Sequence, residues 1–142
     1  MSEKLDVVGI GNAMVDAIIP SNQSEIEKHE INRDSMNLID EGLKNNLHDS
    51  YSIREMAGGG SLGNSMFGIT SFGGNGSFIG KIKNDEIGIY LQKDMVREGL
   101  KFPLGFTSPD ISTGCCTIFV EEDGTRTMCT FLGAGTLIGP ED

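Results

Sequence analysis

The chain has 142 residues, of which 37% are hydrophobic and 23% are charged, a composition typical of one globular domain with a modest core. Its formal net charge of −10 argues against a nucleic-acid partner, because phosphate backbones bind clusters of Lys and Arg. No apolar run reaches the roughly 18 residues of a membrane span and no signal peptide opens the chain, so we expect a cytoplasmic protein without a membrane partner.

Two strands are expected near the N-terminus. Residues 5–11 form a short apolar run that ends in glycines, which is typical of a buried strand feeding a turn at the carboxyl edge of a sheet. Open α/β sheets bind their ligands at that edge. Residues 14–20 are rich in β-branched side chains and stop at Pro20, so they predict a second strand and not a helix.

Helices and strands alternate through the middle of the chain. Ser24 and Glu27 match a capping box, which predicts a brief helix over about residues 24–30. Asp40 is placed to cap a second helix, which carries Leu43 and Leu47. The other expected elements are strands at 36–39, 51–56 and 77–80, a helix at about 61–73, and a helix between Asp85 and Gly99. This order predicts an α/β fold with crossovers between parallel strands.

The last third of the chain is rich in strand patterns. Residues 113–132 contain two such patterns that meet at Asp123-Gly124, a strong signal for a hairpin. We therefore expect a small β-sheet, separate from the α/β core, built from this hairpin and from the strands at 14–20 and 36–39. A sheet inserted over the ligand edge of a core would act as a lid.

The most glycine-rich stretch is Ala57-Gly58-Gly59-Gly60-Ser61-Leu62-Gly63-Asn64-Ser65, which runs into an amphipathic helix pattern. Glycine can adopt positive φ and lets a ligand approach main-chain N–H groups closely. A mobile linker is the alternative interpretation. Linkers seldom carry an Asn and an amphipathic helix directly behind them, so we interpret this stretch as a binding loop.

The cysteines and histidines of the chain do not indicate a disulfide, metal or catalytic site. Cys115, Cys116 and Cys129 match neither a disulfide framework nor a metal site, and we expect reduced, partly buried strand residues. His29 and His48 each fall near the end of a predicted helix, where a cation suits the helix dipole. Catalysis by either histidine is therefore not favoured.

Two nucleotide-binding motifs are present only in part. Gly9-x-Gly11-x-x-Met14 begins like a dinucleotide fingerprint, but Met14 replaces a small residue and a strand follows where a helix should. Gly80-Lys81 resembles the end of a phosphate loop, yet Ile82 replaces the Ser or Thr that would hold Mg²⁺. We therefore expect neither a Rossmann site nor a Walker loop.

Asp16 is the acidic residue of an otherwise apolar strand. Its carboxylate must either face solvent or find partners, because an unpaired buried charge is costly. Ligand hydroxyls are suitable partners, since one carboxylate accepts two hydroxyl hydrogen bonds and can hold a vicinal diol. Asn64, with a donor and an acceptor, can contact a neighbouring hydroxyl. An ordinary solvated Asp16 is the alternative.

Three motifs along the chain resemble those of the ribokinase-like (PfkB) carbohydrate kinases. They are Gly9-x-Gly11-Asn12-x-x-x-Asp16, Gly59-Gly60-Ser61-x-x-Asn64-Ser65 and Phe78-Ile79-Gly80-Lys81-x-x-x-Asp85-x-x-Gly88. Two more resemble the lid hairpin of the adenosine-kinase-like branch, namely Thr113-Gly114-x-Cys116 and Asp123-Gly124-x-Arg126-Thr127. The resemblance covers nearly the whole chain.

This resemblance implies a partial three-layer α/β/α core with a small β-sheet lid over residues 1–142. It implies transfer of the ATP γ-phosphoryl group to a hydroxyl of a sugar or nucleoside, with Mg²⁺ balancing phosphate charge. The residues implied to bind the substrate are Asn12, Asp16, Gly59, Gly60 and Asn64. The lid residues implied beside them are Met14, Ile18, Cys116 and Phe119, of which the three apolar ones have ordinary packing as the alternative.

The chain also departs from this family. The Gly-Ala-Gly-Asp-like motif that supplies the anion hole and the base, in the C-terminal part with most of the ATP site, has no match, since Thr136 follows Gly133-Ala134-Gly135 where the base should be. We therefore expect an N-terminal portion that lacks a catalytic base, binds no ATP or Mg²⁺ alone and is inactive as it stands. A non-catalytic sugar- or nucleoside-binding or oligomerisation module is the alternative.

An incomplete parallel sheet exposes an edge and an apolar face. We therefore expect a homodimer or higher oligomer that forms through the lid strands or the exposed sheet edge. A monodisperse monomer in sedimentation at micromolar concentration would contradict this expectation.

Overall fold

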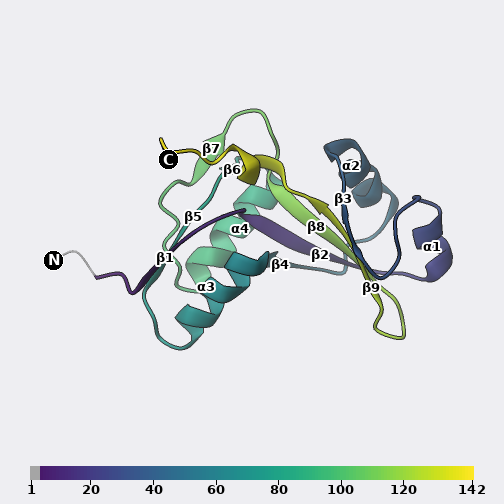
Figure 1. The fold of residues 1–142 in the computed structure, drawn as a ribbon, viewed down its shortest axis with the longest axis horizontal. Helices are drawn as coiled ribbons and strands as arrows, with labels where there is room; N and C mark the ends of the chain where they lie inside the picture. Colours follow the sequence, from purple (N-terminus) through teal and green to yellow (C-terminus); the bar gives the residue numbers. More distant parts are fainter. Residues whose placement is uncertain (1–3) are drawn as a thin grey trace.

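The structure is a computed structural model that describes residues 4–142, and Figure 1 shows its α/β fold. In chain order its elements are β1 Val7–Ile10, β2 Met14–Pro20, α1 Gln23–Glu27, β3 Met36–Leu38, α2 Glu41–Ser50, β4 Glu55–Gly59, α3 Ser61–Ser71, β5 Gly76–Ile79, β6 Ile82–Lys83, α4 Glu86–Arg97, β7 Phe106–Ser108, β8 Gly114–Val120, β9 Arg126–Phe131 and the 3-10 helix η1 Gly133–Leu137. None of these helices is both long enough and apolar enough to cross a membrane.

The part of the molecule nearest the N-terminus is a parallel α/β unit. β1 pairs with β5 in parallel, and α3 and α4 lie beside this pair (Figure 1). A buried cluster fills the space between these helices and strands, and its largest fully buried side chains include Phe78, Met66 and Leu91. The parallel crossover that the sequence predicts is confirmed for this strand pair.

β6 and β7 form a separate parallel pair, and most of the rest of the molecule is built on a five-stranded mixed sheet with the order β3-β9-β8-β2-β4. β8 and β9 form the expected hairpin, and Gly124 in its turn has φ +86°. β2 lies parallel to β8, and β3 lies parallel to β9. The segments 14–20, 36–39 and 113–132 therefore contribute to one sheet, as expected, but β4 joins it as a further strand that the sequence analysis did not place there.

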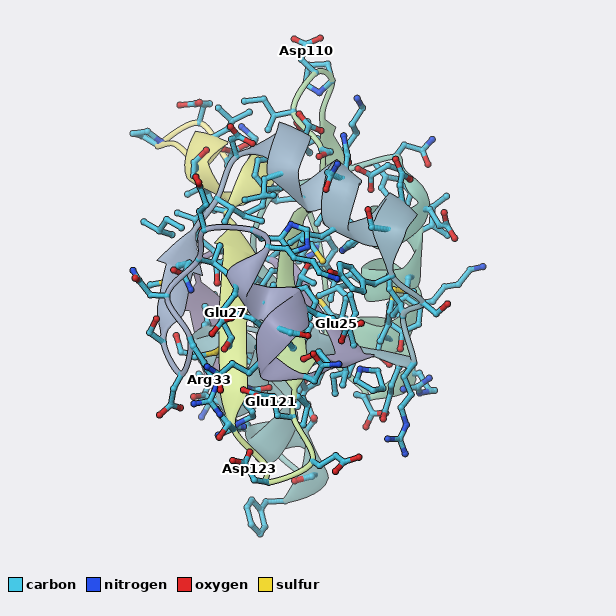
Figure 2. The ribbon with its side chains drawn as sticks, turned by 90° about the vertical axis from the view of Figure 1, so that its right-hand side faces the viewer. Glu25, Glu27, Arg33, Asp110, Glu121 and Asp123 are labelled. Atoms are coloured by element: carbon cyan, nitrogen blue, oxygen red, sulfur yellow. The ribbon has the colours of Figure 1, made fainter. Side chains whose placement is uncertain are left out.

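The two faces of this sheet differ. α1 and α2 cover one face, in front of the sheet in Figure 2, and bury a cluster in which Ile26 and Leu47 contact Phe119. Side chains alternate between the faces along a strand, so Met14, Asp16 and Ile18 of β2 lie on the face away from these helices. The face beneath α1 and α2 therefore packs into a core, whereas these helices do not cover the face that carries Asp16.

Helix capping explains where α1 and α2 begin. Asn22, and not Ser24, caps α1, because its side chain accepts the Glu25 N–H at 3.1 Å while the Glu25 carboxylate accepts the Asn22 N–H at 3.0 Å. The predicted capping box is therefore real but lies two residues earlier than expected. The predicted cap of α2 is confirmed, since Asp40 accepts the Leu43 N–H at 2.8 Å.

The outer edge of β4 is closed by side chains of α4. Asp94, which is 6% exposed, accepts the Gly58 N–H at 2.8 Å. Tyr90 donates its hydroxyl hydrogen to the Met56 carbonyl. A strand at the edge of a sheet normally presents such groups to solvent or to another strand. Here a helix satisfies them, which fixes the glycine-rich end of β4 against the core.

The hairpin end of the sheet is held by an ion pair. Arg33, in the loop before β3, donates to Glu121 at 2.8 and 3.2 Å and lies 3.9 Å from Asp123. Figure 2 shows these three side chains gathered at one end of the molecule, whereas Asp110 lies at the other. Glu121 is buried, so this contact fastens the loop to the start of the turn.

Candidate functional site

The site is organised by the contact between Asp16 and Gly59. Asp16 lies on β2, opposite Ala57 of β4, and the Gly59 backbone passes beside its carboxyl group. A Cβ built on Gly59 would lie 2.3 Å from both Cγ and Oδ1 of Asp16, which no side chain can tolerate. Gly59 is therefore required here for close approach, because only a residue without Cβ leaves space for the carboxylate. The glycine run is strand up to Gly59, not loop.

The Asp16 carboxylate is half-buried and lacks protein partners. Within residues 4–142 it makes no hydrogen bond or ion pair, although it stands between two strands of an apolar sheet. Burial raises the pKa of Asp16 above its ordinary value of 3.8, because desolvation disfavours the charged form. The carboxylate is thus an acceptor whose hydrogen-bonding capacity the described residues leave unused.

Gly60 and α3 follow directly after Gly59 in the chain. Gly60 has φ +78°, the left-handed region that favours glycine, and it begins α3 without a side-chain cap. The first-turn N–H groups of α3 are therefore not satisfied by a capping side chain. Asn64 lies in the first turn of α3 and is exposed. Its backbone N–H donates to the Gly60 carbonyl at 2.9 Å. The predicted amide thus comes from the helix that begins two residues after Gly59.

Asn12 is brought to the same place from the loop between β1 and β2. Its carbonyl oxygen would lie 3.6 Å from a Cβ on Gly60, and its side-chain Oδ1 would lie 2.9 Å from a Cβ on Gly135. In the sequence, residues 133–136 match only an incomplete base motif, with Thr136 where the base should be. The structure instead packs η1 against Asn12, a contact that joins residues far apart in the chain and that no local pattern indicates.

The expected lid residues separate into two groups. Met14 and Ile18 share the face of Asp16, and Cys116 lies directly opposite Asp16 on β8. Phe119 does not join them, because it points to the opposite face and is fully buried beneath α1 and α2. Its position supports the packing alternative and not contact with a ligand at Asp16.

The three cysteines are free and buried. The Thr130 hydroxyl donates to Cys116 Sγ at 3.3 Å. Burial raises the pKa of all three thiols, that of Cys115 to about 12 and that of Cys129 to about 11. They are therefore neutral thiols at physiological pH, and none is an activated nucleophile. Among the residues described, no group of three metal-ligating side chains gathers that could hold a metal ion.

His48 differs from the sequence interpretation. Burial lowers its pKa below 6.5 and the nearby Lys44 ammonium lowers it further, so the ring is neutral rather than a cation that suits the helix dipole. Its Nε2 lies 3.0 Å from the Thr117 hydroxyl and 3.8 Å from Cys115 Sγ. The ring joins α2 to β8 on the face away from Asp16.

A groove of about 760 Å³ lies elsewhere, between α2 and α4. Its lining includes Lys44, His48, Glu86 and Tyr90 and none of the site residues that the sequence predicts. We place the candidate site at Asp16 and not in this groove, because Asp16 is a half-buried carboxylate without a partner among the described residues and Gly59 approaches it closely.

Comparisons with known proteins support this fold. The pattern of the pfkB family carbohydrate kinases matches residues 4–141. An adenosine kinase of Sinorhizobium meliloti is 37% identical, with a TM-score of 0.87, and the match covers 98% of this chain and 42% of that one. A probable sugar kinase of Rhizobium etli is 34% identical, with a TM-score of 0.86 and coverages of 97% and 42%. No curated protein sequence matches.

The chain thus spans about 42% of the length of these solved relatives. An adenosine kinase of Anopheles gambiae shares the fold, with a TM-score of 0.82 at 23% identity. The family pattern matches almost every residue, and two relatives are more than 30% identical, which together show the family of this chain. The chain belongs to the pfkB family of carbohydrate kinases and is similar to its adenosine-kinase-like branch.

Proposed function

We propose that this chain is the substrate-binding portion of an ATP-dependent kinase that phosphorylates a hydroxyl group of a nucleoside or sugar. The observation that carries the proposal is the Asp16 carboxylate, half-buried and without a partner beside Gly59. Two adjacent hydroxyl groups would satisfy both of its oxygens and offset its desolvation. Asn64 and Asn12 would contact the neighbouring hydroxyls.

A nucleoside is the preferred substrate in this proposal. The face that carries Asp16 continues into the partly exposed apolar side chains of Ile18 and Ile118, a surface that suits a flat base better than a second polar ring. The identity of 37% to an adenosine kinase supports the same choice. In this proposal the five-stranded sheet is a lid, and Met14, Ile18 and Cys116 cover the bound base.

ATP and Mg²⁺ are not assigned to residues of this chain. The described residues contain no cluster of three or more His, Cys, Asp or Glu side chains that could hold a metal. In the proposal the nucleotide, the metal and the base that deprotonates the hydroxyl belong to a further portion of the enzyme. By itself the chain would bind substrate without transferring phosphate.

Calorimetry tests the proposal directly. Titrating the chain with adenosine, with ribose and with ATP should give saturable heat for adenosine, a weaker response for ribose and none for ATP. No ADP should form when adenosine and ATP-Mg²⁺ are mixed with the chain. Absence of any heat with both adenosine and ribose would contradict the proposal, and steady turnover would contradict the assignment of catalysis to a further portion.

The second candidate function is a non-catalytic binding or oligomerisation module. It is favoured by the exposed apolar side chains at two strands, which are Met36 at 55%, Leu38 at 67%, Val8 at 50% and Ile10 at 66% exposure. Such surfaces promote association between copies. Sedimentation that shows a dimer or larger species without nucleoside binding would favour this module over the kinase portion.

A further inference from the structure

One carboxylate joins the start of α4 to the start of β8. Asp85 Oδ1 accepts the Gly88 N–H at 2.8 Å, which is the usual contact of a helix N-cap. The same oxygen accepts the Thr113 hydroxyl at 2.7 Å, and Oδ2 accepts the Thr113 N–H at 2.9 Å. Hydrogen bonds to a carboxylate are stronger than those between neutral groups, so this is a firm link between two elements.

The space around this link is closed by backbone. Thr113 is fully buried, and its hydroxyl oxygen also accepts the Lys83 N–H at 3.0 Å. A Cβ on Gly88 would lie 2.1 Å from the Lys83 carbonyl oxygen and 2.7 Å from the Thr113 hydroxyl oxygen. On the other side, Gly133 has φ +57° and a Cβ there would lie 2.4 Å from the Ser112 carbonyl oxygen. Residues 112–114 are therefore held from several directions.

The link acts close to the candidate site. Gly114 follows Thr113 and pairs with Met14, and Cys116 pairs with Asp16 in the same parallel ladder. A Cβ on Gly114 would lie 2.9 Å from the Ala13 carbonyl oxygen, so the two strands begin in direct contact. The link between Asp85 and Thr113 fixes the first residues of β8, and it therefore also fixes the part of β2 that carries the Asp16 carboxylate.

We propose that Asp85 is a positioning residue, which fixes the first residues of β8 to the start of α4. Because β8 pairs with β2, Asp85 thereby holds the Asp16 side chain in the position in which it binds ligand hydroxyls. The inference rests on the proposed function in assigning the ligand to Asp16. Asp85 does not touch the ligand in this arrangement. The contrast within the chain is Asp40, which caps α2 through the Leu43 N–H and, among the residues described, bonds to no other element.

Hydrogen exchange without ligand tests the link. Asp85→Asn keeps one acceptor oxygen for the helix cap but loses the charge and an acceptor for Thr113, and Thr113→Val removes only the hydroxyl. Both should speed amide exchange about tenfold at residues 114–116 and 14–16, and Thr113→Ser should restore the slow rate. The matched cap variant Asp40→Asn should leave these amides unchanged.

Adenosine affinity gives the second readout. We expect Asp85→Asn and Thr113→Val to weaken binding about tenfold, and Thr113→Ser and Asp40→Asn to leave it unchanged. Equal exchange rates in Asp85→Asn and Asp40→Asn, or acceleration confined to α4, would overturn the proposal and leave Asp85 a helix cap only. If Asp85→Asn does not fold, the exchange rates and the adenosine affinity of Thr113→Val decide whether the link to β8 exists. A wild-type chain that binds no adenosine refutes the proposed function, while the exchange comparison still judges the link.

Discussion

Replacing Asp16 by Asn should weaken adenosine binding about a hundredfold or more and should also raise the melting temperature of the ligand-free protein. Affinity falls because the amide has one acceptor oxygen and no charge, so two charge-assisted hydrogen bonds to hydroxyls are lost or weakened. Stability rises because the folded protein no longer holds a half-buried carboxylate without a partner. Calorimetry measures the first effect and thermal unfolding the second.

The gain in stability should depend on pH in one direction. The pKa of Asp16 is higher in the folded protein than in the unfolded chain, so the folded state binds this proton more readily. Above the folded pKa the wild type carries the full cost of the charge and the Asn variant is the more stable. As the pH falls through that pKa towards 3.8, the wild type becomes protonated and the difference should vanish.

Asp110→Asn is the matched control for this prediction. Asp110 is exposed and lies at the end of the molecule opposite Glu121 in Figure 2, so the same exchange of carboxylate for amide should change neither affinity nor stability. An Asp16→Asn variant that binds adenosine as the wild type does would remove Asp16 from the site. An unchanged or lower melting temperature would show that the carboxylate is not destabilising.

Replacing Gly59 by Ala should abolish measurable binding and cost about 1–3 kcal/mol of folding stability. The new methyl group would lie 2.3 Å from the Asp16 carboxyl carbon, so either the carboxylate or β4 must move. β4 cannot move freely, because Asp94 of α4 holds the neighbouring Gly58 N–H. The carboxylate is therefore the group that we expect to be displaced from its position.

A double-mutant cycle separates this clash from a general effect of alanine in a strand. In an Asp16→Ala background the carboxylate is absent, so Gly59→Ala should cost much less than it does in the wild type. Gly68→Ala is the matched control, because no atom lies within 4 Å of a Cβ at that helical position and stability should rise by about 1 kcal/mol. Additive costs in the cycle would show that Gly59 and Asp16 do not meet.

Features that depend on a few adjacent residues were predictable from the sequence. Asp40 and Asp85 begin helices where expected, and the Asp123-Gly124 turn joins two antiparallel strands. Each depends on contacts within about four residues, which local patterns describe well. The shift of the α1 cap from Ser24 to Asn22 arose because both residues suit that role and only the geometry decides between them.

Features that depend on distant contacts were not predictable. The face on which Phe119 lies follows from the register of β8 against β2, and a one-residue change of register would reverse it. The strand character of Gly58 and Gly59 depends on pairing with β2 and on Asp94 from a later helix. Likewise, the contact of Gly135 with Asn12 closes a loop of more than a hundred residues, for which no local signal exists.

The closed edge of β4 also limits how copies of this protein can assemble. Tyr90 and Asp94 occupy the Met56 carbonyl and the Gly58 N–H at this edge, so in the described part of the chain β3 is the edge at which the five-stranded sheet can be extended. When a sheet has a single free edge, each copy can pair with one other copy, and no edge is then left for a third. Association through this sheet would consequently yield a discrete two-fold pair and not an open-ended fibre.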